Sequence, residues 1–332
     1  MDFSINLLLF TFSYLIFLFL SIPLHETGHL IGGLLSGYKF SSFRLFSFVW
    51  VIEDHRLICK HSKNSMIAGQ CLMTPVEDEK NFKYILYNLG GGLVNCLCGV
   101  LWIVLLILFY HNQILRPIFV GAISSNLLMG ILSLVPFTLI IPNDGMNLLT
   151  AGKSKSAKHG LYCMLKQNEM LMKEMRYRDM DMNIFQVDSD ADMSSYLAVF
   201  PLFVQASYYA DIGQPDKGRA ALQGINIDAL PVHYRNSINL DRLYHYIITD
   251  PDYEKARAIY NKSEMRITLN MNHPSIIKTI AVYEFFVNDN QEKGKELLEK
   301  AKAAFLSHEN KGVTALSMEN LLYLEQKMKE ST

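Results

Sequence analysis

The sequence contains few cysteines, and their number and spacing exclude two common kinds of site. Among the 332 residues there are five cysteines: Cys59, Cys71, Cys96, Cys98 and Cys163. Their number is odd and no two of them form a C-x-x-C pair. We therefore expect neither a disulfide framework nor a cysteine-based zinc site.

Net charge is also nearly absent. The formal net charge is -1 at pH 7, so there is no global basic field and we expect no nucleic-acid partner. Charged residues are unevenly placed, because residues 1–150 contain three long apolar runs and residues 151–332 carry most of the charge. The sequence therefore predicts a part embedded in a lipid bilayer, followed by a more polar part.

The first apolar run, Phe3–Leu24, lacks any basic residue. It is long enough to cross a bilayer, which takes about 20 mostly apolar residues. A signal peptide would instead need a positive N-terminal region and a small-residue cleavage site. Met1-Asp2-Phe3 has no Lys or Arg, and Ser21-Ile22-Pro23 is a poor cleavage site. We therefore interpret this run as a membrane span.

Two further apolar runs, Tyr84–Tyr110 and Ile118–Ile141, predict a second and a third span. The loop between the first two spans contains these basic residues: Lys39, Arg44, Arg56, Lys60, Lys63, Lys80 and Lys83. The link between the second and third spans contains Arg116 alone. The positive-inside rule then predicts a multi-pass protein of the cell membrane, with the N-terminus outside and the C-terminal half in the cytosol.

Two histidines and a carboxylate follow the first run directly, in the stretch HETGH at residues 25–29. Positions i and i+4 share one face of a helix, so His25 and His29 can bind one zinc ion together. Glu26 would lie beside that ion, where it can act as general base toward water. An H-E-x-x-H string also arises by chance, but ionisable groups in a membrane segment are costly and indicate function.

A catalytic zinc site needs a third protein ligand and one open position. Asp144 is the one carboxylate between Lys83 and the C-terminal half of the sequence, and it follows the third apolar run. An Asp-Gly turn at a helix boundary is the simple interpretation of Asp144 and Gly145 taken alone. Taken together with HETGH on a neighbouring span, Asp144 is predicted to be the third ligand.

Residues 15–150 resemble the site-2 protease family of intramembrane zinc metallopeptidases. The resemblance rests on HETGH in the first span, GGGLVN (residues 90–95) in the second and NDG (residues 143–145) after the third. It implies a mainly α fold, with a three-transmembrane-helix metalloprotease core in residues 1–150 and zinc as the cofactor. Membrane-anchored proteins or peptides would be the substrates.

The resemblance also implies a role for each matching residue. His25, His29 and Asp144 would be the zinc ligands, with Glu26 as the general base. Gly92 and Asn95 would contribute to substrate binding, where Asn95 would position the substrate or stabilise the oxyanion. A polar residue that packs helices beside small glycines is an equally good interpretation of Asn95.

One segment departs from the pattern of that family. Many members have Asn-x-x-Pro shortly before the Asp-Gly, whereas here Ser133 stands three residues before Pro136. Pro136 in turn lies eight residues before Asp144. The departure concerns the register of this segment more than the identity of Asp144.

The loop after the first span is predicted to contain a small β-hairpin region. Residues 38–55 are rich in Phe, Val and Trp with partial alternation, which is typical of a strand, and residues 68–75 could pair with it. An edge strand beside a protease site can bind an extended substrate. A hairpin that lies along the membrane without contacting substrate is the equally good alternative.

The C-terminal half contains a helical pattern with an internal repeat. Lys217-Gly218, Lys255-Ala256 and Lys293-Gly294 recur at steps of 38 residues. Each copy reads as an aromatic helix, a turn and a second helix with a small residue near its start, which is similar to a tetratricopeptide repeat. We predict a linker at residues 151–193 and a soluble cytosolic repeat domain at residues 194–332, which would bind a protein or peptide partner. A helical cap that only stabilises or dimerises the protein is the alternative.

The leading hypothesis is an intramembrane zinc metalloendopeptidase that hydrolyses peptide bonds in or near transmembrane segments. The first alternative is a catalytically inactive membrane adaptor, which would use the protease-like core and the repeats to bind partners. The intact HETGH disfavours it, because an inactive relative has no need of Glu26. A soluble zinc peptidase with a cleaved leader is disfavoured by the second and third apolar runs.

Overall fold

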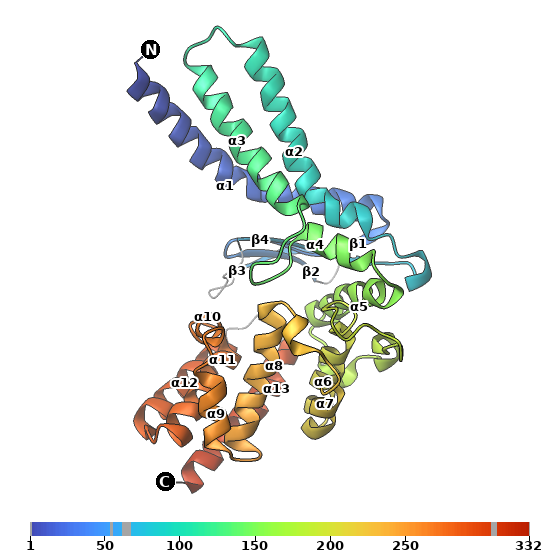
Figure 1. Cartoon of the computed structure of the whole chain (residues 1–332), viewed down its shortest axis with the longest axis vertical. Helices are drawn as coiled ribbons and strands as arrows, with labels where there is room; N and C mark the ends of the chain where they lie inside the picture. Colours follow the sequence, from blue (N-terminus) through green and yellow to red (C-terminus); the bar gives the residue numbers. More distant parts are fainter. Residues whose placement is uncertain (1, 54–55, 62–67, 307–310, 332) are drawn as a thin grey trace. The chain divides into compact units, whose positions relative to one another are not determined.

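The computed structural model describes residues 2–53, 56–61, 68–306 and 311–331. The protein is mainly α, with three long apolar helices, a small antiparallel sheet and further helices in the C-terminal half, so the predicted fold class is confirmed (Figure 1). The chain divides into two compact units. Residues 1–61, 65–138 and 142–169 belong to the first unit, and the remaining segments, chiefly 170–332, belong to the second.

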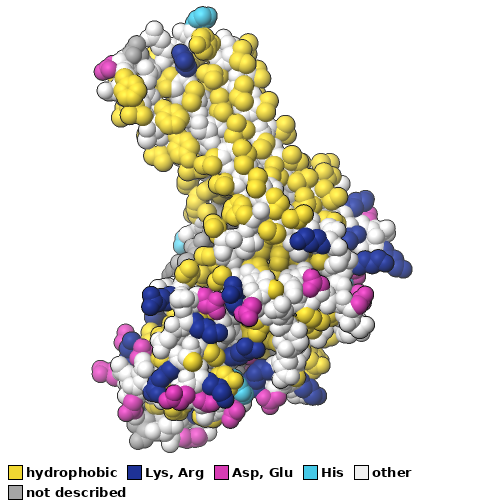
Figure 2. Space-filling view, in the orientation of Figure 1, with side chains coloured by type: hydrophobic (Ala, Val, Ile, Leu, Met, Phe, Trp, Pro, Cys, Tyr) yellow, Lys and Arg dark blue, Asp and Glu magenta, His cyan; other side chains and the backbone are white. Residues whose placement is uncertain are grey.

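Three helices of the first unit are long and apolar enough to cross a membrane. They are α1 (Phe3–Leu35), α2 (Ile85–Leu108) and α3 (Leu115–Leu134). Large apolar side chains such as Leu8, Leu97 and Ile131 are exposed on their outer surfaces, and Figure 2 shows these helices covered by hydrophobic side chains. Exposed apolar surface of this extent fits a lipid environment rather than water.

The first and third predicted spans differ most from their helices, chiefly at their C-terminal ends. The third run was expected to reach Ile141, whereas α3 ends at Leu134. The cause is Pro136, because the residue before a proline disfavours helical backbone. The first helix is longer than expected, since α1 continues past Leu24 to Leu35 with Pro23 inside it. HETGH therefore lies within a continuous helix.

Glycines allow α1 and α2 to approach each other closely at the level of HETGH. A Cβ atom on Gly28 would lie 2.2 Å from the carbonyl oxygen of Gly90. One turn further along, a Cβ atom on Gly32 would lie 2.2 Å from the carbonyl oxygen of Leu86. The two backbones are thus in direct contact, as is common where small residues meet in membrane helices.

The loop after α1 folds into a four-stranded antiparallel sheet with the order β3-β2-β1-β4. The strands are β1 (Tyr38–Leu45), β2 (Phe48–Glu53), β3 (Arg56–His61) and β4 (Gly69–Pro75). The predicted pairing of residues 68–75 with the first strand is confirmed, since β4 pairs with β1 from Tyr38↔Pro75 to Leu45↔Gly69. A register shift between Phe40 and Ser42 interrupts this ladder. β4 lies at one edge of the sheet.

Shorter elements complete the first unit. The 3₁₀ turn η1 (Glu79–Asn81) precedes α2, and α4 (Asp144–Ala151) follows α3. The segment 151–193, which the sequence predicted as a linker, contains α5 (Lys155–Met172) and the 3₁₀ turns η2 (Tyr177–Asp179) and η3 (Met182–Phe185). Most of α5 belongs to the first unit, because the division falls after Glu169.

The second unit contains three helix pairs in the order that the repeat predicts. They are α6 (Phe200–Asp211) with α7 (Pro215–Ala221), α8 (Val232–Ile248) with α9 (Tyr253–Tyr260), and α11 (Pro274–Val282) with α12 (Gln291–Leu306). The π-helical segment η5 (Tyr283–Val287) continues α11. The turn η4 (Ile227–Ala229) and the short helix α10 (Met265–Leu269) lie in the connections, and α13 (Lys311–Glu330) closes the unit.

Two of the repeated small residues lie where the second helix of a pair contacts the first helix or its continuation. A Cβ atom on Gly218 would lie 2.8 Å from the carbonyl oxygen of Ala206, and one on Gly294 would lie 2.6 Å from the Cβ of Phe285. Ala256, the matching residue of the middle pair, is fully buried. The 38-residue step therefore reflects a repeated packing contact, as expected for stacked helical repeats.

Candidate metal centre

The two histidines of HETGH lie one turn apart on the same face of α1. His25 and His29 are both buried, with 8% and 6% of their surface exposed. Their Nε2 atoms face each other at 3.1 Å. The Nδ1 atom of His29 lies 2.7 Å from the backbone oxygen of Tyr87 on α2, and Nδ1 of His25 lies 3.4 Å from Nδ2 of Asn95. Each ring is thus contacted by α2 on its outer side.

Asp144 is the first residue of α4, and the end of α3 holds it in place. Asn143 caps α4 by accepting a hydrogen bond from the backbone N–H of Met146 at 2.9 Å, and its Nδ2 donates to the carbonyl oxygens of Leu132 and Val135 at 2.7 Å each. The hydroxyl of Ser133 donates to Oδ2 of Asp144 at 2.7 Å. Four hydrogen bonds therefore fix this carboxylate and the start of its helix.

Gly145 explains why glycine follows the aspartate. A Cβ atom there would lie 2.2 Å from the carbonyl oxygen of Leu134, so a side chain would push α4 away from α3. The Asp-Gly pair is therefore not a simple turn. It begins a helix that packs against the end of the third long helix.

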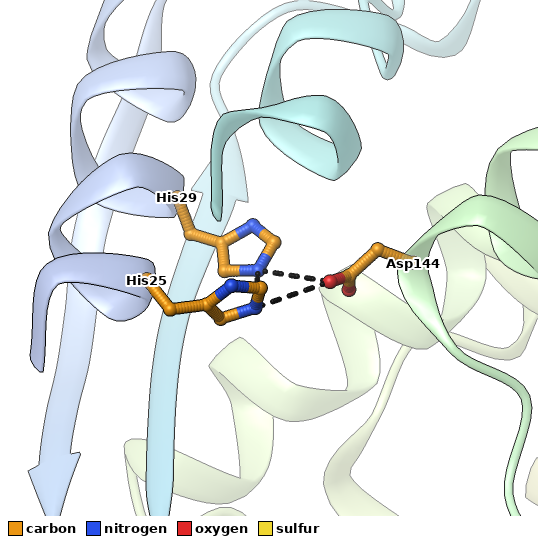
Figure 3. A group of neighbouring side chains, drawn as sticks. All are labelled: His25, His29 and Asp144. Carbon is orange, nitrogen blue, oxygen red and sulfur yellow. Dashed lines mark hydrogen bonds and ion pairs between the residues drawn. The ribbon is translucent and has the colours of Figure 1, made fainter. Parts of the chain in front are cut away.

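The three side chains converge on one point, as Figure 3 shows. Oδ2 of Asp144 lies 3.2 Å from Nε2 of His25 and 3.3 Å from Nε2 of His29. Among the described residues, these three are the group whose ligand atoms could hold a metal ion. Zinc bonds of 2.0–2.2 Å in a tetrahedron place neighbouring ligand atoms roughly 3.3 Å apart. The separations within the group fit that arrangement.

Gly91 on α2 keeps the space between the ligands open. A Cβ atom on Gly91 would lie 2.6 Å from Nε2 of His25 and 2.7 Å from Nε2 of His29. Such an atom would occupy the position of a metal ion bound by both nitrogens. The two nitrogens, the carboxylate oxygen and this gap together fit a zinc ion.

Glu26 lies beside this group and against the edge strand. Its side chain is buried, with 7% of the residue exposed. A Cβ atom on Gly69, the first residue of β4, would lie 2.7 Å from Oε1 of Glu26. The Glu26 carboxylate also interacts electrostatically with both histidines and with Asp144. The general-base role of Glu26 stays a prediction, and its position near the group is compatible with that role.

Asn95 and Gly92, the predicted substrate-binding residues, lie in different surroundings. Asn95 is fully buried and contacts His25. Gly92 faces α3, where a Cβ atom would lie 2.5 Å from Cγ of Leu134 and 3.2 Å from the carbonyl oxygen of Gly130. Asn95 therefore lies beside the histidines, and Gly92 lies in the contact between α2 and α3. The roles of both residues toward substrate stay predictions.

The buried surroundings of the site change the pKa values of two ionisable groups that lie outside the long helices. Burial raises the pKa of Asp144, but hydrogen bonds from His25 and His29 outweigh it, so that this pKa lies well below its usual value. Burial, together with the charge of Glu26, raises the pKa of the Cys71 thiol on β4 to about 12. Asp144 is therefore an anionic carboxylate that could hold a metal ion, whereas Cys71 stays a protonated thiol and is a poor metal ligand.

Sequence reasoning missed three contributors to the site. Tyr87 acts through its backbone oxygen, which every residue possesses, so no sequence signal could have identified it. Gly91 is the middle glycine of the GGG stretch, but spacing alone does not tell which glycine faces the histidines. Ser133 was noted as a departure from a family pattern, and its position three residues before Pro136 was the available signal.

Comparisons of the chain with models of protein families, with curated proteins and with solved structures give no significant match.

Proposed function

We propose that this protein is an intramembrane zinc metalloendopeptidase of the site-2 protease type. The observation that carries the proposal is the convergence of two histidine nitrogens and one carboxylate oxygen, 3.1–3.3 Å apart. The histidines lie on α1, which is long and apolar enough to span a membrane, and the carboxylate lies at the start of α4. The HETGH, GGGLVN and NDG motifs support the same class. Buried ionisable groups in such helices are costly, which favours a functional site over a structural one.

Within this proposal each residue has a separate task. His25, His29 and Asp144 hold the zinc ion, which when bound polarises the scissile carbonyl and makes water more acidic. Glu26 accepts the proton of the attacking water and then donates it to the leaving amine. The close contact of α1 and α2 at Gly28 and Gly90 keeps the site narrow and limits the access of water.

The edge strand β4 supports a peptide as the substrate. Its partner β1 occupies one side of β4, and Glu26 lies beside Gly69 at the start of this strand. A substrate segment that leaves its helical form would add to the other edge of β4 by backbone hydrogen bonds. There it would displace the Tyr87 hydroxyl, which donates to the carbonyl oxygen of Cys71 at 2.7 Å. The scissile bond would then lie next to Glu26, which favours a membrane-anchored protein or peptide as the substrate.

The orientation and the partner of the second unit belong to the same proposal. The excess of Lys and Arg in the loop before α2 favours an N-terminus outside the cell and a cytosolic second unit. Stacked helix pairs commonly bind a protein or peptide. We infer that a cytosolic partner binds there and brings substrates or regulation to the membrane part.

The first test is the metal content of the detergent-purified full chain. We expect about one zinc ion per wild-type chain and a sharp loss in His25→Ala and in Asp144→Ala, because a structural or catalytic site needs all of its ligands. His111→Ala is the matched control, since His111 is an exposed histidine near the end of α2. Wild-type protein that is folded, never treated with chelator and free of zinc would contradict the proposal.

The second test separates a peptidase from an inactive adaptor. Transmembrane reporter proteins are co-expressed with wild type and with Glu26→Gln, and their cleavage is followed by size. We expect Glu26→Gln to retain zinc and to lose cleavage by about 10²–10⁴-fold, the usual contribution of a general base. Full zinc occupancy without any cleavage that depends on Glu26 would favour the adaptor.

A further inference from the structure

The outer nitrogens of the two histidines are contacted by different groups. Nδ1 of His29 lies 2.7 Å from the backbone oxygen of Tyr87. A carbonyl oxygen can only accept a hydrogen bond, so Nδ1 of His29 carries a proton, and in the neutral ring its Nε2 then has the lone pair. This is the form of the ring that binds a metal through Nε2.

His25 has a side-chain amide in the corresponding place. Nδ2 of Asn95 lies 3.4 Å from Nδ1 of His25, a long separation for a hydrogen bond. Asn95 has 0% of its surface exposed. Within the part of the chain that the structure describes, its Oδ1 is buried and has no hydrogen-bond partner.

A half-turn of the amide gives Oδ1 of Asn95 a hydrogen-bond partner, while Nδ2 takes the position that Oδ1 had. The oxygen and nitrogen of an asparagine amide have nearly the same shape, and a half-turn of the group exchanges them. After the exchange, Oδ1 of Asn95 accepts a hydrogen bond from the protonated Nδ1 of His25. The buried oxygen gains a partner, and His25 takes the same form as His29.

We propose that Asn95 is a positioning residue, which accepts a hydrogen bond from Nδ1 of His25 and so presents Nε2 to the metal ion. The inference rests on the proposed function and adds a role for Asn95 that is separate from substrate binding. Asn95 and Tyr87 lie on the same helix, α2, one for each histidine. α2 thus fixes both rings of α1 from the outer side.

The membrane setting makes this acceptor necessary. A ring N–H directed into a helix bundle cannot turn to water, and lipid offers no acceptor. Partners of metal-bound histidines commonly affect metal affinity 10–100-fold when they are removed. Replacing Asn95 by an apolar residue of similar size should therefore weaken zinc binding without removing any ligand.

The test measures zinc affinity of the detergent-purified full chain by competition with a coloured chelator. We expect Asn95→Leu to bind zinc about 10–100-fold more weakly than wild type. Asn95→Asp keeps acceptor oxygens at this place and should restore the wild-type affinity. Asn126→Leu is the matched control, because Asn126 on α3 is equally buried and also has an unpaired Oδ1, but its Nδ2 donates to the carbonyl oxygen of Ala122.

A second measurement needs no variant at position 95, and so covers the case in which Asn95→Leu does not fold. Nitrogen spectra of zinc-loaded wild type with ¹⁵N-labelled histidine should show His25 protonated at Nδ1 and metal-bound at Nε2, with its signals assigned by their loss in His25→Ala. An unprotonated Nδ1 of His25 would overturn the inference.

The affinity outcomes separate this inference from the proposed function. Two results in a wild type that binds zinc would overturn the role of Asn95 alone. One is an Asn95→Leu variant that binds zinc as tightly as wild type, and the other is an Asn95→Asp variant that binds it as weakly as Asn95→Leu. Wild type that binds no zinc overturns both. Zinc binding that depends on Asn95 in a protein without peptidase activity supports Asn95 and contradicts the peptidase.

Discussion

At the scale of single residues, the neighbouring glycines Gly91 and Gly92 should respond differently to the same substitution. We expect Gly91→Ala to lose stoichiometric zinc, because the new Cβ atom would lie 2.6–2.7 Å from both Nε2 atoms of the histidines. Gly92→Ala places its Cβ against the flexible Leu134 side chain, so it should keep zinc and cost about 1–3 kcal/mol of stability by overpacking. Zinc content and thermal unfolding of both variants check this.

The opposite result for the two glycine variants would mean that the metal ion does not bind beside Gly91. If Gly92→Ala released zinc and Gly91→Ala retained it, the ligands would not share the space that Gly91 leaves open. Equal retention in both variants would mean that no metal ion occupies that space.

Ser133 should contribute to the metal centre through Asp144. Its hydroxyl donates to the same oxygen, Oδ2, that faces the histidines. We expect Ser133→Ala to weaken zinc binding about 10-fold, the lower range for a partner of a metal ligand, and Ser133→Thr to restore it. Chelator competition measures both, with Ser125→Ala as control, since the Ser125 hydroxyl is buried on the same helix and donates to Ala122. Equal affinity in Ser133→Ala and wild type would leave Ser133 without a role.

The three residues of the candidate metal centre could be predicted from the sequence, but the residues that support them could not. His25 and His29 follow from helical spacing, and Asp144 follows from being the one carboxylate between Lys83 and the C-terminal half of the sequence. Tyr87, Gly91 and Ser133 depend on which faces of α1, α2, α3 and α4 meet. Spacing within one helix does not determine the rotation of that helix against another, so these contacts needed the three-dimensional structure.

At the scale of elements, the same limit appears at helix ends and in the sheet. The end of α3 at Leu134 follows from Pro136, which is a local signal. The continuation of α1 to Leu35 depends on packing against α2, where Gly28 and Gly32 meet the opposite backbone. Pairing of β4 with β1 was predicted from strand-like sequence, but the order β3-β2-β1-β4, which leaves β4 at the edge, was not.

The hairpin of β2 and β3 carries an apolar face that should lie in the bilayer interface. Phe48, Trp50 and Ile52 alternate along β2, and Leu57 of β3 pairs with Ile52. Phe48, Ile52 and Leu57 have 50%, 52% and 64% of their surfaces exposed. Just before β2, Phe46 stacks on Phe19 of α1 with ring centroids 4.8 Å apart, which connects this face with the first long helix.

Fluorescence of Trp50 tests the position of the hairpin. In a Trp102→Phe variant, Trp50 is the remaining tryptophan, and we expect brominated lipids to quench it, because aromatic residues favour the membrane interface. The reciprocal variant, Trp50→Phe, gives the value for Trp102, which lies on α2 between Phe17 and Phe119. Quenching of Trp50 by aqueous iodide but not by brominated lipid would place the hairpin in water.

At the scale of the whole molecule, the metal ion should stabilise the first unit without affecting the second. All three proposed ligands belong to the first unit. The second unit has a separate core in which residues such as Leu243, Val282 and Leu324 are fully buried. A bound ion stabilises only the part of a protein whose unfolding releases it. Zinc should therefore stabilise the first unit, which contains the proposed ligands, and leave the stability of the second unit unchanged.

Hydrogen exchange of the full chain, with zinc and after chelation, measures this difference directly. With free zinc at 100 times its dissociation constant, protection should increase by about 2.7 kcal/mol for amides of α1 and α4 that exchange by unfolding of the first unit. Amides of α8 and α12 should not change. Asp144→Ala is the control, because it keeps both units but removes one ligand, and its exchange should not depend on zinc. An equal increase of protection in both units would mean that they unfold together, and no increase in α1 would contradict a metal centre built from His25, His29 and Asp144.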